Sequence, residues 1–180
     1  MRFQFQFACI IGLAAVAGAQ APASLQLRGD RFKPLAYPRM TAEQRALTDL
    51  VLTGKIEGGA NGPMNVLLRS PEYGEAILRY GAFVRFHASL PMKLNELAAL
   101  VAIRYWGAQF PWYAHHCAGT QAGLTEATIA AIAEGRRPAS LPSDEQVVYN
   151  FSAELLKTTQ MSDATFNAAK ERWESAAWWN

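Results

Sequence analysis

The stretch from Leu94 to Ile103 restricts the fold of this chain most, because it is apolar on nearly every side when wound as a helix. A helix of that kind belongs in the middle of a bundle, where other elements cover it. It nevertheless carries one carboxylate, Glu96. A buried carboxylate is strongly disfavoured unless another group bonds it, so we expect a basic partner on the neighbouring helix.

His115 is the best candidate for that partner. Glycine and proline near Gly107 and Pro111 break the chain after the first helix. A second helix is predicted from Pro111 to Ala122, with Gly123 in the usual terminating position. The carboxylate and the imidazole are therefore expected on two consecutive helices that face each other.

The adjacent histidines should have different roles, because neighbouring residues on a helix point about 100° apart. His115 shares its face with Trp112, Ala118, Gly119 and Ala122, and His116 shares its face with Tyr113, Thr120 and Gly123. Small residues on the first face let a partner helix approach closely, whereas the face that carries His116 is expected to be more exposed to solvent. We predict that His115 points inward, near the helix N-terminus, where the dipole favours the neutral imidazole that a general base needs.

The N-terminus is typical of an export signal. Residues 1–19 combine a basic start at Arg2, an apolar run over 7–17 and the small residues Ala17-Gly18-Ala19. The run is too short to span a membrane. We expect cleavage and a periplasmic or secreted protein without membrane attachment, with an uncleaved anchor as the alternative.

The rest of the chain is predicted to be one all-α domain, residues 41–180, preceded by an irregular arm over 20–40 that Pro34 and Pro38 keep from being helical. Leu35 and Tyr37 are available to dock the arm on the body. A glycine-rich loop over 55–64 could line a pocket. Besides the helix around Glu96, helices are predicted over 41–54, 71–86, 111–122, 125–135, 143–157 and from Ser162 or Asp163 onward, with caps at Thr41, Ser70, Thr125 and Ser143.

Charge and cysteine content exclude some classes of protein. The chain has 17 Lys and Arg against 15 Asp and Glu, which argues against an electrostatic nucleic-acid binder. Cys9 lies in the predicted export signal, so Cys117 is the remaining cysteine and no intrachain disulfide is expected after export. Cys117 is predicted to be a small buried filler.

The segment KLNELAALVAIRYWGAQFPWYAHHCAGTQAG, residues 93–123, resembles the core motif of the carboxymuconolactone decarboxylase and alkylhydroperoxidase D-like superfamily. The thiol peroxidase branch carries a Glu, a Cys-x-x-Cys pair and a His. The glutamate aligns with Glu96 and the histidine with His115, while Ala108 and Pro111 occupy the cysteine positions. The segments QFPWYAHH and AGLTEATIAAIAEG look more like the decarboxylase branch, and weaker similarity covers residues 65–166.

The resemblance implies an alkylhydroperoxidase D-like multi-helix bundle that forms a trimer or hexamer. It implies acid–base chemistry on a small organic acid or carboxylated lactone, without metal or organic cofactor. His115 would donate and accept the proton, and Glu96 would orient it. Candidate substrate contacts are Arg85, Arg104, Trp112 and Tyr80, with Arg79 as a further possible carboxylate clamp.

Other interpretations stay open at this point. The Glu–His pair is also typical of a packing contact in a non-catalytic binding or assembly protein. A peroxidase is disfavoured, because its cycle needs one thiolate to attack the peroxide and a second to resolve the sulfenic acid. A metal site formed by Glu96 with His87, His115 and His116 is disfavoured because adjacent histidines diverge. Tryptophans 173, 178 and 179 fit either an oligomer interface or docking on the chain's own body.

Overall fold

The computed structural model describes residues 32–57 and 63–173, and within these ranges every regular element is a helix, as predicted. The elements are η1 (Tyr37–Arg39), α1 (Ala42–Leu52), α2 (Met64–Leu67), α3 (Pro71–Ala82), η2 (Phe83–His87), α4 (Met92–Trp106), α5 (Gln109–Gln121), α6 (Glu126–Ala133), α7 (Ser143–Thr158) and α8 (Asp163–Trp173). The predicted export signal, the first part of the arm, residues 58–62 of the glycine-rich loop and tryptophans 178 and 179 lie outside the described residues.

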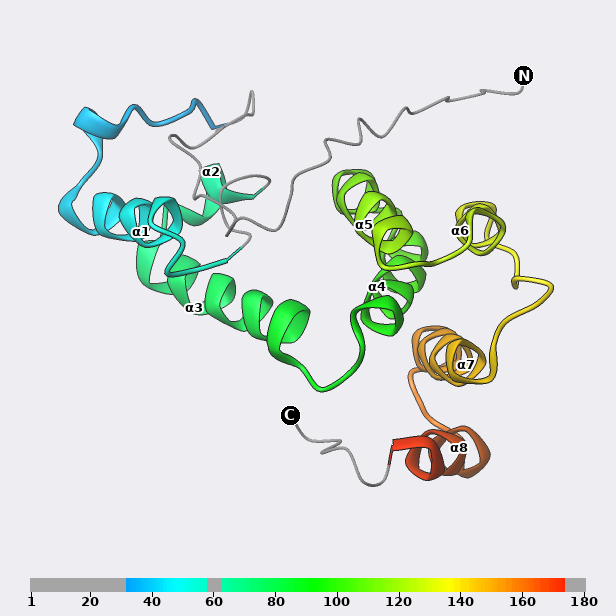
Figure 1. Ribbon diagram of the computed structural model, residues 1–180. Helices are drawn as coiled ribbons and strands as arrows, with labels where there is room; N and C mark the ends of the chain where they lie inside the picture. Colours follow the sequence, from blue (N-terminus) through cyan, green and yellow to red (C-terminus); the bar gives the residue numbers. More distant parts are fainter. Residues whose placement is uncertain (1–31, 58–62, 174–180) are drawn as a thin grey trace, which may run out of the picture.

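Helix α4 is the centre of the C-terminal half, as its apolar sequence predicts. Helices α5, α6 and α7 pack around it, and α8 packs on α7 (Figure 1). Leu97 and Leu100 are fully buried, and Ile129 of α6 and Val148 of α7 close the same core. Trp173 also packs against this core from α8. The placement of α4 thus sets which of its side chains face α5.

The N-terminal half has a separate core. The helices that carry it, α1 and α2, lie apart from α4 to α8 in Figure 1. Leu47 and Val51 of α1 pack there with Met64 of α2, so the predicted helix buries one apolar face in this core. Leu35 of the arm packs against this cluster, and the Tyr37 hydroxyl donates to Asp49 at 2.8 Å. The arm is therefore docked on the body in the way the sequence predicts.

The ends of the helices follow local chemistry with two exceptions. Thr41 forms the predicted capping box, and Thr125 caps α6 by accepting from the Thr128 amide. Ser70 makes no side-chain cap bond, and Pro71 after it has a fixed φ that already suits the first position of a helix. Helix α7 begins at Ser143 itself, so the predicted cap is the first helical residue and Pro142 precedes it.

The helix predicted over 71–86 changes its winding near its end. After Ala82 the chain continues as a π-helical turn, η2, and its carbonyls are partly satisfied by the Asn95 amide, which donates to Val84 at 2.6 Å and to Arg85 at 3.3 Å. A π turn shifts the directions of the side chains that follow it. It brings the end of η2 against α4, next to Glu96.

Apolar and aromatic residues at helical spacing form a stripe along α3 and η2, and this stripe is exposed in the single chain. The members of this stripe are Tyr73, Ile77, Tyr80 and Val84. Tyr80 is 68% exposed. None of the described helices combines the length and apolar character needed to cross a membrane.

Candidate functional site

Glu96 and His115 meet between α4 and α5. Glu96 is 1% exposed, and its Oε2 lies 2.6 Å from Nδ1 of His115. The predicted contact between a buried carboxylate and an imidazole on the next helix is therefore present. A separation of 2.6 Å is short even for a charge-assisted hydrogen bond, so this pairing fixes the orientation of the ring.

Gly119 explains how α5 comes close enough to α4. It lies one turn after His115 on the same face and is buried. A Cβ at this position would lie 3.0 Å from Leu124 Cδ1, 3.3 Å from Leu100 Cδ1 and 3.7 Å from Glu96 Cβ. Only glycine fits this approach without displacing its neighbours, as the small-residue face predicted.

Arg85 completes the site from η2. Its Nε donates to Glu96 Oε1 at 3.2 Å, so each carboxylate oxygen of Glu96 has its own basic partner. The Arg85 side chain is 30% exposed and its guanidinium carbon lies 5.3 Å from the Phe86 ring centroid. Among the described residues, its two terminal nitrogens have no hydrogen-bond partner.

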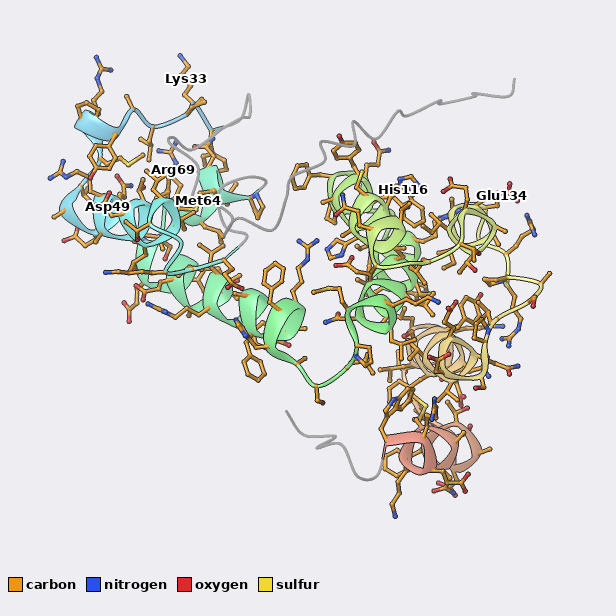
Figure 2. The ribbon with its side chains drawn as sticks, viewed as in Figure 1. Lys33, Asp49, Met64, Arg69, His116 and Glu134 are labelled. Atoms are coloured by element: carbon orange, nitrogen blue, oxygen red, sulfur yellow. The ribbon has the colours of Figure 1, made fainter. Side chains whose placement is uncertain are left out.

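The prediction that His116 is more exposed to solvent than His115 is wrong. Its side chain is 22% exposed against 21% for His115, so the second histidine is not wetter than the first. His116 lies on the side of α5 that faces α6 (Figure 2), with its Nε2 3.6 Å from Glu126 of α6. Helical spacing gave the directions of the two rings correctly, but it did not reveal that α6 covers the second.

The other predicted substrate contacts have neighbours other than Glu96 among the described residues. Arg104 donates from Nε to the Ala133 carbonyl at 2.8 Å, at the C-terminus of α6. Trp112 packs against the core around α4. Tyr80 is on the exposed stripe of α3 and η2. Their roles as substrate contacts stay predictions.

The remaining candidates are also placed. Arg79 pairs with Glu75 one turn away on α3, and His87 is 58% exposed and faces Glu57 at 3.4 Å. Cys117 is half-buried rather than fully buried as predicted. Within the ranges that the structure describes, no cluster of three or more His, Cys, Asp or Glu is arranged to hold a metal ion.

The structure contains a second buried carboxylate that was not predicted from the sequence. Glu145 of α7 is 1% exposed and forms an ion pair with Lys93 of α4. An acidic residue in the first turn of a helix is ordinary, so no pattern marked Glu145 as buried. Its ion pair links α7 to the turn of α4 that precedes Glu96, and so helps to hold α4 in place.

One protein family model matches the chain, over the helices that carry Glu96, His115 and Arg85. Residues 71–147 match the carboxymuconolactone decarboxylase family model, and the all-helical arrangement is consistent with an alkylhydroperoxidase D-like bundle. No curated protein and no solved structure matches the chain. The match begins at the first residue of α3 and ends in α7, so it includes Arg85, Glu96 and His115. Residues 71–147 of this chain are therefore a carboxymuconolactone decarboxylase family domain.

Proposed function

We propose that the chain is an exported acid–base enzyme of the lyase or isomerase type, acting on a small organic acid or carboxylated lactone. The single observation that carries the proposal is the geometry of Glu96, which accepts from His115 Nδ1 and from Arg85 Nε while itself 1% exposed. A buried carboxylate that orients an imidazole is a recurring arrangement for general acid–base catalysis.

His115 is the proton-carrying group in this proposal. With Glu96 ionised, the carboxylate can only accept, so the ring proton lies on Nδ1 and Nε2 is left as the base. Nε2 then removes a proton from a carbon next to a carbonyl and returns it to another position. In a decarboxylation, the bond between the substrate carbon and its carboxylate breaks, carbon dioxide leaves, and the electron pair remains on the substrate as a dienolate. Nε2, which has first taken a proton from solvent, then gives that proton to the dienolate.

Arg85 is the substrate-binding group. Its Nε is held by Glu96, so the two terminal nitrogens project as a fork that fits a carboxylate. This places a cation for the substrate carboxylate beside the imidazole, because both side chains share the same glutamate. A cation at that point also stabilises the negative charge that develops as the dienolate forms.

Proton exchange in D2O tests this proposal across a range of candidate substrates. We would incubate the protein with a panel of small carboxylated lactones and organic acids, and follow deuterium incorporation and carbon dioxide release by NMR. His115→Gln should slow the reaction by about 100-fold or more, as loss of a general acid–base group does. Arg85→Gln should raise KM, because the substrate carboxylate loses its partner, and lower kcat, because the developing negative charge loses its cation.

His116→Gln is the matched control. It removes an adjacent imidazole of nearly equal exposure from the same helix, without touching Glu96. The H116Q protein should retain the activity of the native chain. Equal losses in H115Q and H116Q, or no reaction with any panel member, would contradict the proposal.

The proposal includes export and self-association. The apolar run and small residues of 1–19 support export. Self-association into a trimer or hexamer is supported by exposed aromatic side chains in the described residues, since Trp106 is 74% and Tyr80 is 68% exposed. Light scattering of the purified protein after size-exclusion chromatography measures this directly.

A non-catalytic binding or assembly protein is the second candidate. It is favoured by the same exposed aromatic surface and by the position of the cavity described below, which does not include Glu96 or His115. In this case, replacing both Glu96 and His115 by leucine would leave the self-association and the partner binding of the protein unchanged.

A further inference from the structure

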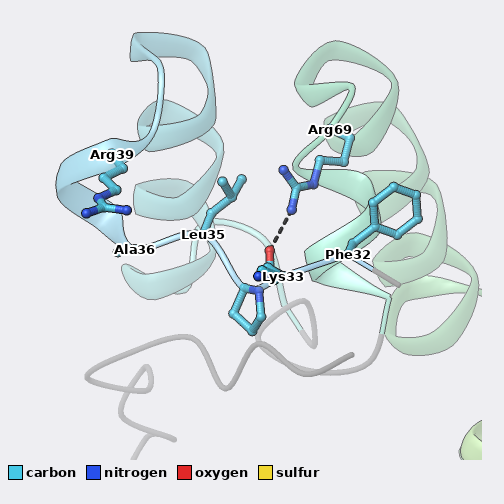
Figure 3. Close-up of a pocket in the computed structure, with 7 residues that line it drawn as sticks. Phe32, Lys33, Leu35, Ala36, Arg39 and Arg69 are labelled. Atoms are coloured by element: carbon cyan, nitrogen blue, oxygen red, sulfur yellow. Dashed lines mark hydrogen bonds between the residues drawn. The ribbon is translucent and has the colours of Figure 1, made fainter. Parts of the chain in front are cut away.

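A cavity of about 410 Å³ lies in the N-terminal half, between the docked arm and Arg69, which follows α2. Phe32 and Leu35 contribute apolar lining, and Arg39 and Arg69 contribute two cations. Lys33 lines the cavity with its backbone, and its side chain points away from the helices (Figure 2). In Figure 3 the Arg39 and Arg69 side chains come from different segments, with Leu35 between them. Among the residues that the structure describes, no acidic side chain lines this cavity.

Arg69 is held in place by two contacts with the arm. Its terminal nitrogen donates to the Lys33 carbonyl at 2.7 Å, as the dashed line in Figure 3 shows, and its guanidinium carbon lies 5.6 Å from the Phe32 ring centroid. A guanidinium that is fixed by a backbone oxygen and an aromatic face loses little side-chain entropy when it binds a ligand. It is therefore a preorganised cation.

The positive charge of this cavity is not neutralised by the described part of the protein. Among the described residues, none of Lys33, Arg39 and Arg69 forms an ion pair with a carboxylate. Like charges around one hollow repel each other, and an anion relieves that repulsion. The apolar lining favours an anion that also has a hydrophobic body.

We propose that this cavity binds a small organic dianion, such as an aromatic or alicyclic dicarboxylate, with its carboxylates on the cations and its body against Leu35 and Phe32. The volume is in the range of small-molecule sites. The site precedes residue 71, so it lies outside the part of the chain that matches the family. It is also separate from Glu96 and His115, and it does not depend on the proposed acid–base chemistry.

Calorimetric titration of the full chain with phthalate tests the proposal, with uncharged phthalamide as the ligand control. Phthalate should bind at low ionic strength and bind more weakly as salt is added. The variant K33E/R39E should weaken phthalate binding about tenfold or more. Both side chains are exposed and make no described side-chain bond, so the fold should survive the change.

The variant K157E/R172E is the charge control, because it makes the same change in net charge on exposed residues of α7 and α8. It should bind phthalate within about twofold of the native chain, since these charges are remote from the cavity. The absence of saturable phthalate binding, or equal binding by K33E/R39E and the native chain, would overturn the proposal.

His115→Gln separates the two sites. It should leave phthalate binding at the arm cavity unchanged even if it abolishes the proposed acid–base reaction. Phthalate binding that is lost in H115Q and kept in K33E/R39E would show that the probe occupies the Glu96 site. That result would overturn the cavity proposal and leave the proposed function standing.

Discussion

Replacing His115 by leucine should destabilise the fold by about 2–3 kcal/mol, because it removes one of the two partners of a carboxylate that is 1% exposed. A hydrogen bond to a charged group contributes about 1.5–3 kcal/mol, and a buried acceptor left without its partner also keeps its desolvation penalty. Arg85 still bonds the other oxygen of Glu96, so the loss should stop short of that for an isolated buried charge.

Urea unfolding at neutral pH measures this loss, provided that the m-value does not change. His116→Leu is the control: its partner Glu126 is 74% exposed at 3.6 Å, so the change should be within about 0.5 kcal/mol. The double variant E96L/H115L should recover most of the stability, because it removes both buried polar groups. Equal destabilisation by H115L and H116L would show that the bond between His115 and the buried Glu96 does not stabilise the fold.

Three further predictions concern the helices that carry the site. Gly119→Ala should destabilise the fold by about 1–3 kcal/mol through overpacking. Gly81→Ala should stabilise it, because a Cβ at this position meets nothing within 4 Å. Equal shifts in the urea midpoint would contradict the close packing of α5 on α4 at Gly119. Lys93→Met should destabilise the fold by about 3 kcal/mol, because it leaves the buried Glu145 carboxylate without its ion-pair partner. Urea unfolding measures this loss. The double variant K93M/E145L should have nearly the stability of the native chain, and a double variant as unstable as K93M would contradict the prediction. Hydrogen bonds from the start of α8 hold the pKa of Glu154 below its ordinary value of 4.5, so its contribution is present above that pH and is lost as the pH falls further. The Tm difference between the native chain and Glu154→Gln should therefore shrink below about pH 4, and a difference independent of pH would contradict this.

The Glu96–His115 contact could be predicted because it follows from local rules. A carboxylate on a helix that is apolar all round needs a partner, and helical spacing together with small residues indicates which face of the next helix supplies it. Gly119 was on that predicted face, and the structure shows what a side chain would meet there. Two consecutive helices and the break between them are sufficient to predict this contact.

The partners that come from more distant segments could not be predicted in the same way. The contact of Arg85 with Glu96 depends on the π-helical winding of η2, and no glycine or proline occurs within Phe83–His87 to signal that winding. The exposure of His116 depends on α6, and the burial of Glu145 depends on how α7 packs on α4. Helical periodicity gives the direction of a side chain but not the element that covers it.

The 15N NMR spectrum of the His115 ring, recorded at a pH where the ring is neutral, shows directly whether Glu96 orients the imidazole. We expect the ring proton on Nδ1, where Glu96 accepts it, and we expect Glu96→Leu to shift the proton toward Nε2. A ring protonated on Nε2 in the native chain, with no change in the E96L variant, would contradict the claim that Glu96 orients His115 for proton transfer.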